Sequence, residues 1–457
     1  ACASLCIRLF SHTFAIIYLI GQRGAGFRGS LEPITQPEGV DVDRPTVGSV
    51  QILRGNALAL ALADESVDLI VTSPPYFGLR SYQDGGEHYA GQIGDEPTPA
   101  EFVDALIAAT AEMVRVLKPS GSIWVNLGDK YAGSNGMPGG AGSSTLTGQD
   151  RAHKAAGTGI RRPAATGAPT KSLIGIPWRY AIRCIDDLGL ILRAEVIWSK
   201  PNGLPESVTD RVRRSHEQWF HFTREPRYFS AVDEIREAHL APNRSGTNPK
   251  HESAPFAAGI PAHTSLSTTQ PNPLGKLPGS VWTIPTEPLH VPESLGIDHF
   301  AAFPTEWPRR IIQGWSPRGV CVECGEGRRP VAVRESPIEF GPRIGERNRQ
   351  RQGTGPSGNG LNVQPTTITG YACACPDTSA PTRPAVVLDP FGGTGTTALV
   401  AKALGRHGIS NDMSADYCRL AGWRTTDPKQ LAKAARRPFV PPAEQTEGQL
   451  DLLEGIA

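Results

Sequence analysis

The chain has 457 residues, of which 50 are Gly and 41 are Pro, and 39% are apolar. At about 150 residues per domain, this length allows roughly three domains and excludes a minimal scaffold, while the excess of Gly and Pro indicates long connections between ordered parts. The formal net charge of +1 predicts by itself neither a nucleic-acid partner nor an acidic substrate.

The charge is nevertheless unevenly distributed along the chain. Residues 51–130 hold 5 Lys and Arg against 11 Asp and Glu, whereas residues 151–250 hold 17 against 10. Residues 309–353 hold 10 Arg and 5 Glu. Basic segments after an acidic block are typical of a protein that binds a polyanion with part of its surface. The alternative is a codon bias, since 36 of the 46 basic residues are Arg.

The first 47 residues are predicted to form an extension outside the folded core. The longest apolar run here, residues 14–20, is too short to span a bilayer, which needs about 20 apolar residues in a helix. Arg8 precedes the run, as in a signal peptide, but no clean small-residue cleavage site follows it. We therefore expect a cytoplasmic protein with no membrane partner.

Two strands with a short helix between them are predicted before the first candidate site. Residues 51–53 and 67–72 are apolar, β-branched runs, and residues 57–66 have a helix-like composition. The second run is followed by Ser73-Pro74-Pro75-Tyr76. Two consecutive prolines cannot continue a sheet ladder, so they fix a rigid loop at the carboxyl end of the strand, where open α/β sheets bind ligands. A structural turn is the alternative, but the position after a buried strand favours a functional site.

The cysteines farther along the chain do not indicate a disulfide framework. Four of the eight come in two close pairs, Cys321 with Cys324 and Cys373 with Cys375. Two pairs of thiolates suit a tetrahedral structural zinc site, because each short turn offers two soft ligands to one side of the metal. Redox chemistry is the alternative, but no thioredoxin-like strand and helix surround either pair.

The second candidate site follows a strand predicted at residues 385–388. The next residues read Asp389-Pro390-Phe391-Gly392-Gly393-Thr394-Gly395-Thr396-Thr397, and residues 398–404 continue as a helix. The glycines let the backbone approach a bound molecule closely while the helix N-terminus points at it. A dinucleotide-binding loop is the alternative, since Ala398 falls where the last glycine of that pattern would lie. A strand predicted at residues 407–411 ends before Asp412, which is placed to hold the ribose hydroxyls of a dinucleotide or of S-adenosylmethionine.

Together these motifs resemble those of the permuted, beta-type DNA amino-methyltransferases, in which an S/D-P-P-Y catalytic loop comes early and an F-x-G-x-G cofactor loop comes late. Residues 73–76 match the first motif and residues 391–395 match the second. Further landmarks of the family are a turn at residues 117–121 before a strand at 122–129, a hairpin of residues 191–202 and 218–223, and a segment at 299–304 that closes over the methionine moiety of the cofactor.

The resemblance implies an α/β, Rossmann-like, S-adenosylmethionine-dependent methyltransferase fold that is circularly permuted and carries an inserted zinc-ribbon-like module. The implied divisions are an extension at 1–47, a catalytic half at 48–230, a target-recognition region at 231–285, a cofactor-closing segment at 286–318, a zinc-ribbon insertion at 319–380, an S-adenosylmethionine-binding half at 381–425 and a tail at 426–457.

The resemblance also implies a role for each motif. An exocyclic amine is a poor nucleophile until hydrogen-bond acceptors grip its N–H groups, and Ser73 and the carbonyl of Pro74 take that part. Tyr76 stacks on a base that has been rotated out of the duplex. The implied cofactor contacts are Asn56, Phe300, Phe303, Asp389, Phe391, Gly392, Gly393, Gly395, Thr396 and Asp412. Asn56 stands where the family usually has Asp, but its amide oxygen can still accept a bond from the adenine amine.

The position that receives the methyl group is narrowed by two observations. Methylation at cytosine C5 usually needs a thiolate that follows a proline, and no cysteine here follows one. Within the family a serine such as Ser73 favours N4 of cytosine over N6 of adenine, which stays open. The expected partner is double-stranded DNA, and a cognate restriction endonuclease is a candidate. The alternatives are a non-catalytic zinc-ribbon DNA-binding protein with a degenerate methyltransferase fold and a nicotinamide-dependent oxidoreductase.

Overall fold

The structure is a computed structural model. It describes residues 48–78, 83–84, 87–88, 91–133, 167–203, 205–206, 208–238, 272–297, 302–334, 366–375 and 380–439. The predicted extension at 1–47 and the predicted cofactor contact Phe300 lie outside these residues, as does most of the predicted target-recognition region.

The core is an eight-stranded sheet with the strand order β1-β14-β13-β2-β5-β7-β6-β8. In that order the strands are β1 (Ser49–Arg54), β14 (His407–Asp412), β13 (Val386–Asp389), β2 (Val67–Thr72), β5 (Leu117–Leu127), β7 (His216–Thr223), β6 (Ile191–Ser199) and β8 (Val281–Thr283). Neighbouring strands are parallel except where β7 pairs with β5 and β6, so β7 alone of these strands runs in the opposite direction. The predicted hairpin is therefore the antiparallel pair β6–β7.

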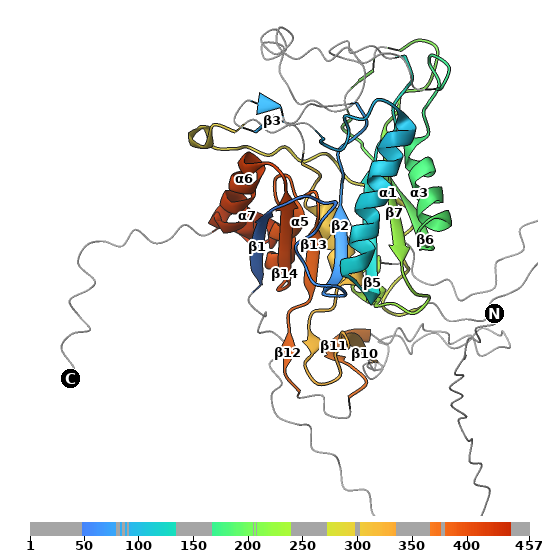
Figure 1. Cartoon of the computed structure of the whole chain (residues 1–457). Coiled ribbons are helices and arrows are strands. Elements are labelled where there is room, and N and C mark those ends of the chain that lie inside the picture. The colour runs from blue at the N-terminus through green and yellow to red at the C-terminus, as the bar shows by residue number, and fades with distance from the viewer. Residues whose placement is uncertain are drawn as a thin grey trace, which may run out of the picture. The chain divides into compact units, whose positions relative to one another are not determined.

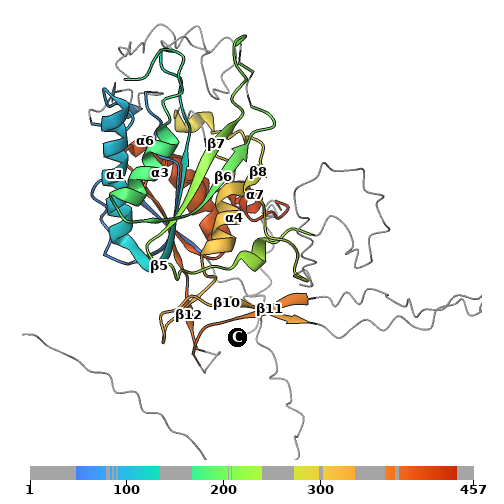
Figure 2. The same ribbon diagram turned by 90° about the vertical axis from the view of Figure 1, so that its right-hand side faces the viewer.

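Helices cover both faces of the sheet, and Figure 2 shows the resulting layers. Helices α1 (Pro99–Val116) and α3 (Ile176–Asp186) pack on one face, and α4 (Glu306–Trp315), α5 (Thr396–Ala403) and α7 (Pro428–Ala434) pack on the other. Helix α6 (Ala415–Thr426) lies against β1 and β14. Helix α7 begins the stretch predicted as a tail, yet its Ala434 is buried in the second face. No helix in the described part of the chain is long and apolar enough to cross a bilayer.

The remaining elements are small. They are the 3₁₀ helices η1 (Val232–Ile235) and η2 (Glu293–Leu295), and the strand pairs β3 (Gln83–Asp84) with β4 (Glu87–His88), β9 (Val320–Cys321) with β12 (Thr382–Arg383), and β10 (Arg329–Arg334) with β11 (Thr366–Ala372). Figure 1 shows β10, β11 and β12 together below the large sheet.

Strands β13 and β2 lie side by side although the chain places them far apart. Val387 pairs with Leu69 and Leu388 pairs with Ile70 in parallel register. From β13 the chain passes through α5 to β14 on one side, and from β2 it passes through α1 to β5 on the other. Connections that leave in opposite directions create a topological switch point, and ligands of α/β sheets bind at the carboxyl ends of the strands there. Both predicted loops begin at this point.

The helix predicted at residues 57–66 is wrong, because the chain forms turns there. Arg115 of α1 donates from Nη2 to the Leu60 carbonyl at 2.8 Å and from Nη1 to the Leu62 carbonyl at 2.9 Å. Glu112 accepts a hydrogen bond from the Leu60 N–H at 3.1 Å. These side chains satisfy backbone groups that a helical ladder would otherwise pair, so the segment does not need to be helical.

The turn predicted at residues 117–121 lies inside strand β5. Leu117 pairs with Val67 and Ser122 pairs with Leu69, so the residues between Leu117 and Ser122 bulge opposite Asp68 alone. Lys118 closes the bulge, with its Nζ 2.5 Å from Asp68 Oδ1. From Ser122 the strand pairs regularly with β2, as far as Val125 opposite Thr72, and it carries Asn126 to the carboxyl edge of the sheet.

Candidate active site and metal centre

The catalytic loop predicted from the sequence begins where β2 ends. All six residues of β2 are buried, so the strand is fixed on both faces. Pro74 is buried, whereas Ser73 and Tyr76 are half-buried at the edge of the sheet. Thr72, the last residue of β2, donates a 2.6 Å hydrogen bond to Asp389 Oδ1 at the end of β13. The start of the loop is therefore tied to the neighbouring strand β13.

Two polar side chains from other strands hold the loop from the side. The Ser73 Oγ donates to Asn126 Oδ1 of β5 at 3.3 Å. The Tyr76 hydroxyl lies 2.8 Å from the same Asn126 oxygen and 2.9 Å from Glu217 Oε2 of β7. Glu217 Oε1 in turn lies 2.5 Å from Lys200 Nζ. Asn126, Glu217 and Lys200 thus form a polar wall beside the loop.

The Tyr76 ring packs closely against the backbone at Gly128. A Cβ added at Gly128 would lie 2.7 Å from Tyr76 Cε2, which is closer than side-chain carbons approach one another. Gly128 therefore lets the ring lie against the backbone that follows β5. A ring held near Cε2 and at its hydroxyl has a fixed position, from which it can stack on a flat ligand.

The cofactor loop predicted from the sequence is braced by Asp389. Its carboxylate accepts bonds from Thr72, from Thr397 Oγ1 at 2.9 Å and from the Phe391 N–H at 3.2 Å. Asp389 is 1% exposed, and burial raises its pKa to about 6 in spite of the hydrogen bonds, which lower it. The structure therefore gives Asp389 contacts within the protein that join the two loops.

The glycines of this loop allow close approaches that a side chain would prevent. A Cβ at Gly392 would lie 2.0 Å from Ser410 Oγ of β14, and one at Gly395 would lie 2.8 Å from the Ala421 Cβ of α6. Gly393 has a φ of +48°, and the nearest atom to its added Cβ is the Phe391 carbonyl oxygen at 3.9 Å. The loop thus packs tightly on β14 and α6, while Gly393 leaves open space in front of it.

A buried arginine supports the start of α5 behind the loop. Arg424 Nη1 donates to Thr394 Oγ1 and to Thr396 Oγ1, both at 2.7 Å. The side chain comes from α6, and burial lowers its pKa to about 10. Arg424 therefore keeps both threonine hydroxyls turned toward the protein interior.

Asp412 and Asn56 meet at the ends of β14 and β1. Asp412 Oδ2 accepts from the Gly393 N–H at 2.8 Å, and Oδ1 accepts from the Ser414 N–H at 2.9 Å. The Gly55 N–H donates to the Asp412 carbonyl at 3.0 Å, which places the exposed Asn56 beside it. Asn56 Oδ1 accepts from the Leu58 N–H at 2.9 Å, so this oxygen also shapes the turn.

Three aromatic residues were predicted to contact the cofactor, and the structure describes two of them. These two side chains lie on different faces of the sheet. Phe391 packs against the cluster under α1 and α3, and Phe303 packs against the cluster under α4. The Phe303 ring meets Trp219 edge to face, with 5.8 Å between centroids. Both rings are half-buried.

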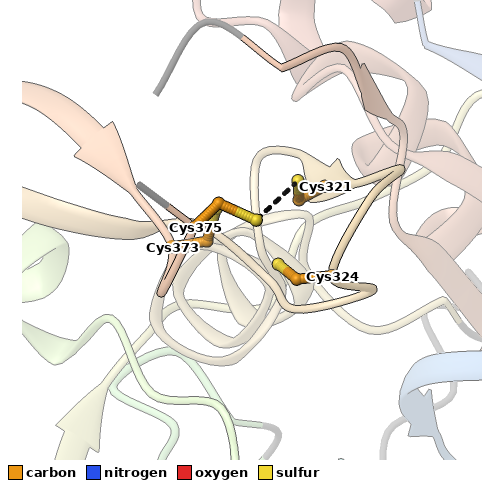
Figure 3. A group of neighbouring side chains, drawn as sticks. All are labelled: Cys321, Cys324, Cys373 and Cys375. Atoms are coloured by element: carbon orange, nitrogen blue, oxygen red, sulfur yellow. Dashed lines mark hydrogen bonds between the residues drawn. The ribbon is translucent and has the colours of Figure 1, made fainter. Parts of the chain in front are cut away.

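The four predicted metal ligands come together. The sulfur atoms of Cys321, Cys324, Cys373 and Cys375 all lie within 4.8 Å of one another, as Figure 3 shows. The Cys321 and Cys375 sulfurs are 3.8 Å apart, which is too far for a disulfide. Zinc–sulfur bonds of about 2.3 Å in a tetrahedron give sulfur–sulfur distances of about 3.8 Å.

The cysteine cluster lies at the amino end of β13, opposite the loops. Cys321 of β9 pairs with Thr382 of β12, and β12 ends shortly before β13 begins. The Val322 N–H donates to the Pro381 carbonyl at 3.1 Å, and a Cβ at Gly319 would lie 2.7 Å from Thr382 Oγ1. The cluster therefore shapes the entry of the chain into β13 and has no part in the surface around Ser73.

Sequence reasoning missed Asn126, Glu217 and Arg424. A buried polar residue within an apolar strand needs a partner, and Asn126 stands in such a run, so that signal was available. No pattern near Glu217 or Arg424 indicates their partners, which lie on other elements.

Comparison with known proteins gives a match on both sides of the segment that carries most of the clustered cysteines. A family model for DNA methylases of the N6 and N4 type matches residues 67–322 and 380–422. The chain belongs to this family of DNA methyltransferases. The family membership confirms the resemblance read from the two loops and contradicts the oxidoreductase alternative. The match omits residues 323–379, so three of the four clustered cysteines lie in an insertion into the family's fold.

Individual relatives of this N6/N4 DNA methylase support the assignment. The chain is 32% identical over 292 residues to the type II methyltransferase M.SmaI of Serratia marcescens, covering 63% of this chain and 83% of that protein. It is 40% identical over 188 residues to M.XycI of Xanthomonas campestris pv. cyanopsidis, covering 41% of this chain and 58% of that protein. The solved PvuII DNA methyltransferase (cytosine-N4-specific) aligns with a TM-score of 0.45 at 18% identity, over 86% of this chain and 93% of that one.

Proposed function

We propose that this DNA methyltransferase transfers a methyl group from S-adenosylmethionine to the N4 amine of cytosine in double-stranded DNA. The observation that carries the proposal is the 2.6 Å bond between Thr72 and Asp389. It holds the loop of Ser73 beside the loop of Gly393 at the switch point of the sheet, so an acceptor for an amine and a cradle for a cofactor share one edge.

The residues around the second loop fit S-adenosylmethionine. Gly393 leaves open space above the backbone, and the start of α5 points into the same region. Asp412 is fixed by two backbone N–H groups and lies where ribose hydroxyls would be held, with Asn56 beside it for the adenine. The proposed contacts are Asn56, Phe300, Phe303, Phe391, Gly392, Gly393, Gly395, Thr396 and Asp412, and Asp389 acts by joining the two loops.

The target amine is activated by acceptors on the first loop. Ser73 Oγ and the carbonyl of Pro74 grip the two N–H groups, which frees the nitrogen lone pair from conjugation with the ring. S-adenosylmethionine supplies a methyl group on a positively charged sulfur, and the carbon–sulfur bond breaks as the nitrogen–carbon bond forms. The methylated nitrogen then releases one proton to water. Tyr76 stacks on the base, which must leave the duplex because stacking hides its amine.

Two features support the choice of substrate. A serine at position 73, in place of aspartate, favours cytosine N4 in the resemblance, with adenine N6 as the second candidate. The relatives are named type II methyltransferases. We therefore propose that the modification protects DNA from a cognate restriction endonuclease.

Methyl transfer tests the proposal directly. Purified protein, duplex DNA and S-adenosylmethionine with a labelled methyl group should give labelled DNA. Ser73→Ala should slow transfer by about a hundredfold, because one acceptor in the transition state is lost. The matched control is Ser66→Ala at the opposite end of β2, where the hydroxyl donates to the Ala63 carbonyl at 2.7 Å. Equal rates for Ser73→Ala and the wild type would overturn the assignment of the loop.

We further propose that the four cysteines bind a structural zinc ion. The sulfur spacing fits a tetrahedron of thiolates, and none of the four approaches the loops at the carboxyl edge. Zinc with four cysteine ligands has no open position for a substrate. Its contribution here is to close the insertion and fix the β9–β12 pair before β13.

A further inference from the structure

We infer that Asn126 and Glu217 are positioning residues that fix the directions of two hydroxyl protons, so that Ser73 meets the target amine as an acceptor. The inference rests on the proposed function, because it concerns how Ser73 receives an N–H group. A serine hydroxyl is both a donor and an acceptor, and only its acceptor side can bind an amine that has protons to give. Something must therefore turn the Ser73 proton away from the base.

The orientation of the Asn126 amide is determined by the strand next to it. Asn126 Nδ2 donates to the Gln218 carbonyl at 3.0 Å. A flipped amide would place two oxygens face to face at that position, so Oδ1 must point toward Ser73 and Tyr76. Asn126 is 1% exposed, which leaves the oxygen little water as an alternative partner.

Among the described side chains, two acceptors lie in reach of the single Tyr76 hydroxyl proton. Asn126 Oδ1 is 2.8 Å away and Glu217 Oε2 is 2.9 Å away. Glu217 is paired with Lys200, whose Nζ lies 2.5 Å from its other carboxylate oxygen. A charged acceptor forms the stronger bond, so the phenol proton goes to Glu217.

The Asn126 Oδ1 atom then accepts its hydrogen bond from the Ser73 hydroxyl. Ser73 Oγ donates to it over 3.3 Å, which leaves the lone pairs of the serine oxygen to accept from the amine. This bond is the longest of the set, so it is sensitive to competition for its acceptor. Glu217 thus acts on Ser73 without touching it, through Tyr76 and Asn126.

A double-mutant cycle tests this chain of contacts. In Glu217→Gln the amide oxygen stays with Lys200, and the amide N–H₂ meets the Tyr76 oxygen. The phenol proton must then turn to Asn126 Oδ1, and this second donor on one oxygen weakens the bond that the oxygen accepts from Ser73. We expect single-turnover methyl transfer at saturating S-adenosylmethionine to fall by about tenfold, the effect of one weakened hydrogen bond in the transition state.

The same substitution in a Tyr76→Phe background has no phenol proton to redirect. Glu217→Gln should therefore change the rate of Tyr76→Phe by less than about twofold. The affinity for S-adenosylmethionine, measured by calorimetry, should be the same in all four proteins. Glu225→Gln, an exposed position beyond the end of β7, is the matched control and should transfer at the wild-type rate.

The outcomes separate this inference from the proposed function. A tenfold cost of Glu217→Gln in both backgrounds would show that Glu217 acts through its charge or through the fold, and would overturn the inference alone. Absence of methyl transfer by the wild type to any DNA would overturn the proposed function and the inference with it.

Discussion

The buried carboxylate of Asp389 joins the two candidate loops where β2 and β13 end. Asp389 accepts hydrogen bonds from the ends of both β2 and α5, and it is 1% exposed. Burial disfavours its charged form, which is why its pKa is raised to about 6. Asp389 thus joins two parts of the chain that are far apart in sequence. Its buried charge lowers the stability of the folded protein near neutral pH.

Because the buried charge of Asp389 lowers stability, we expect Asp389→Asn to raise the free energy of unfolding by an amount that depends on pH. The folded pKa of Asp389 is raised, so its stabilising contribution is present in acid and is lost as the pH rises through 6. An asparagine keeps the shape, since its oxygen can accept from Thr72 and its N–H₂ can donate to Thr397, whose own proton can then turn to the Val71 carbonyl 3.1 Å away. We expect the variant to be more stable at pH 8 by up to about 3 kcal/mol, from a shift of about two pKa units.

Urea unfolding of both proteins between pH 4 and pH 8 measures this gain. The advantage of Asp389→Asn should shrink as the pH falls from 6 to 4, where the wild-type carboxyl takes up its proton in the folded state. A difference in unfolding free energy that stays constant with pH would contradict the assignment.

Candidate residues within the two motifs could be predicted from the sequence, and the side chains that contact them could not. Ser73 and Asp412 became candidates because their neighbours in sequence form motifs. Asn126 and Glu217 reach the same site from β5 and β7, and their roles follow from strand pairing that brings Leu127 opposite Gln218. A contact between residues far apart in sequence leaves no local pattern.

At the scale of elements, the cysteine-bearing insertion is separate from the catalytic edge. The pairs β9–β12 and β10–β11 lie at the amino end of β13, and the family match is interrupted over most of this region. Figure 3 shows the cysteines converging from two separate stretches of chain. A metal held here closes the insertion as a loop, so the strand that leads to the cofactor loop starts from a fixed position.

The metal proposal predicts one zinc ion per chain and a loss of stability when it is removed. Elemental analysis of the purified protein should find zinc, and Cys324→Ser or Cys373→Ser should reduce it and lower the melting temperature by several degrees. Cobalt should replace zinc and give the visible absorption of tetrahedral thiolate coordination. Cys418→Ser, in α6 outside the cluster, should retain the metal. Full retention of zinc in both cluster variants would contradict the site.

Elements with a strong local pattern were predicted well, and an element shaped by tertiary contacts was not. Strands β2 and β13 are apolar runs with a proline within two residues of their ends, and both formed where expected, to within one residue. Residues 57–66 have helix-forming composition, but Arg115 and Glu112 of α1 take up their backbone groups. Tertiary contacts overrode propensity there.

At the scale of the whole molecule, chain order and spatial order differ. The catalytic loop comes early in the sequence and the cofactor loop comes late, yet β2 and β13 are neighbours in the centre of the sheet. The resemblance to permuted methyltransferases predicted this arrangement, and the family match on both sides of the insertion supports it. The net charge of +1 likewise combines an acidic catalytic stretch with basic segments later in the chain, so near-neutrality does not argue against DNA as the substrate.

The central claim is that Ser73 and its loop direct a methyl group to an exocyclic amine of cytosine. The most direct test is mass spectrometry of nucleosides from DNA of a host that expresses the protein, with the Ser73→Ala variant as the control. We predict N4-methyldeoxycytidine in DNA from cells with the wild type and its loss with the variant. Detection of N6-methyldeoxyadenosine alone, or of no methylated nucleoside, would contradict the account.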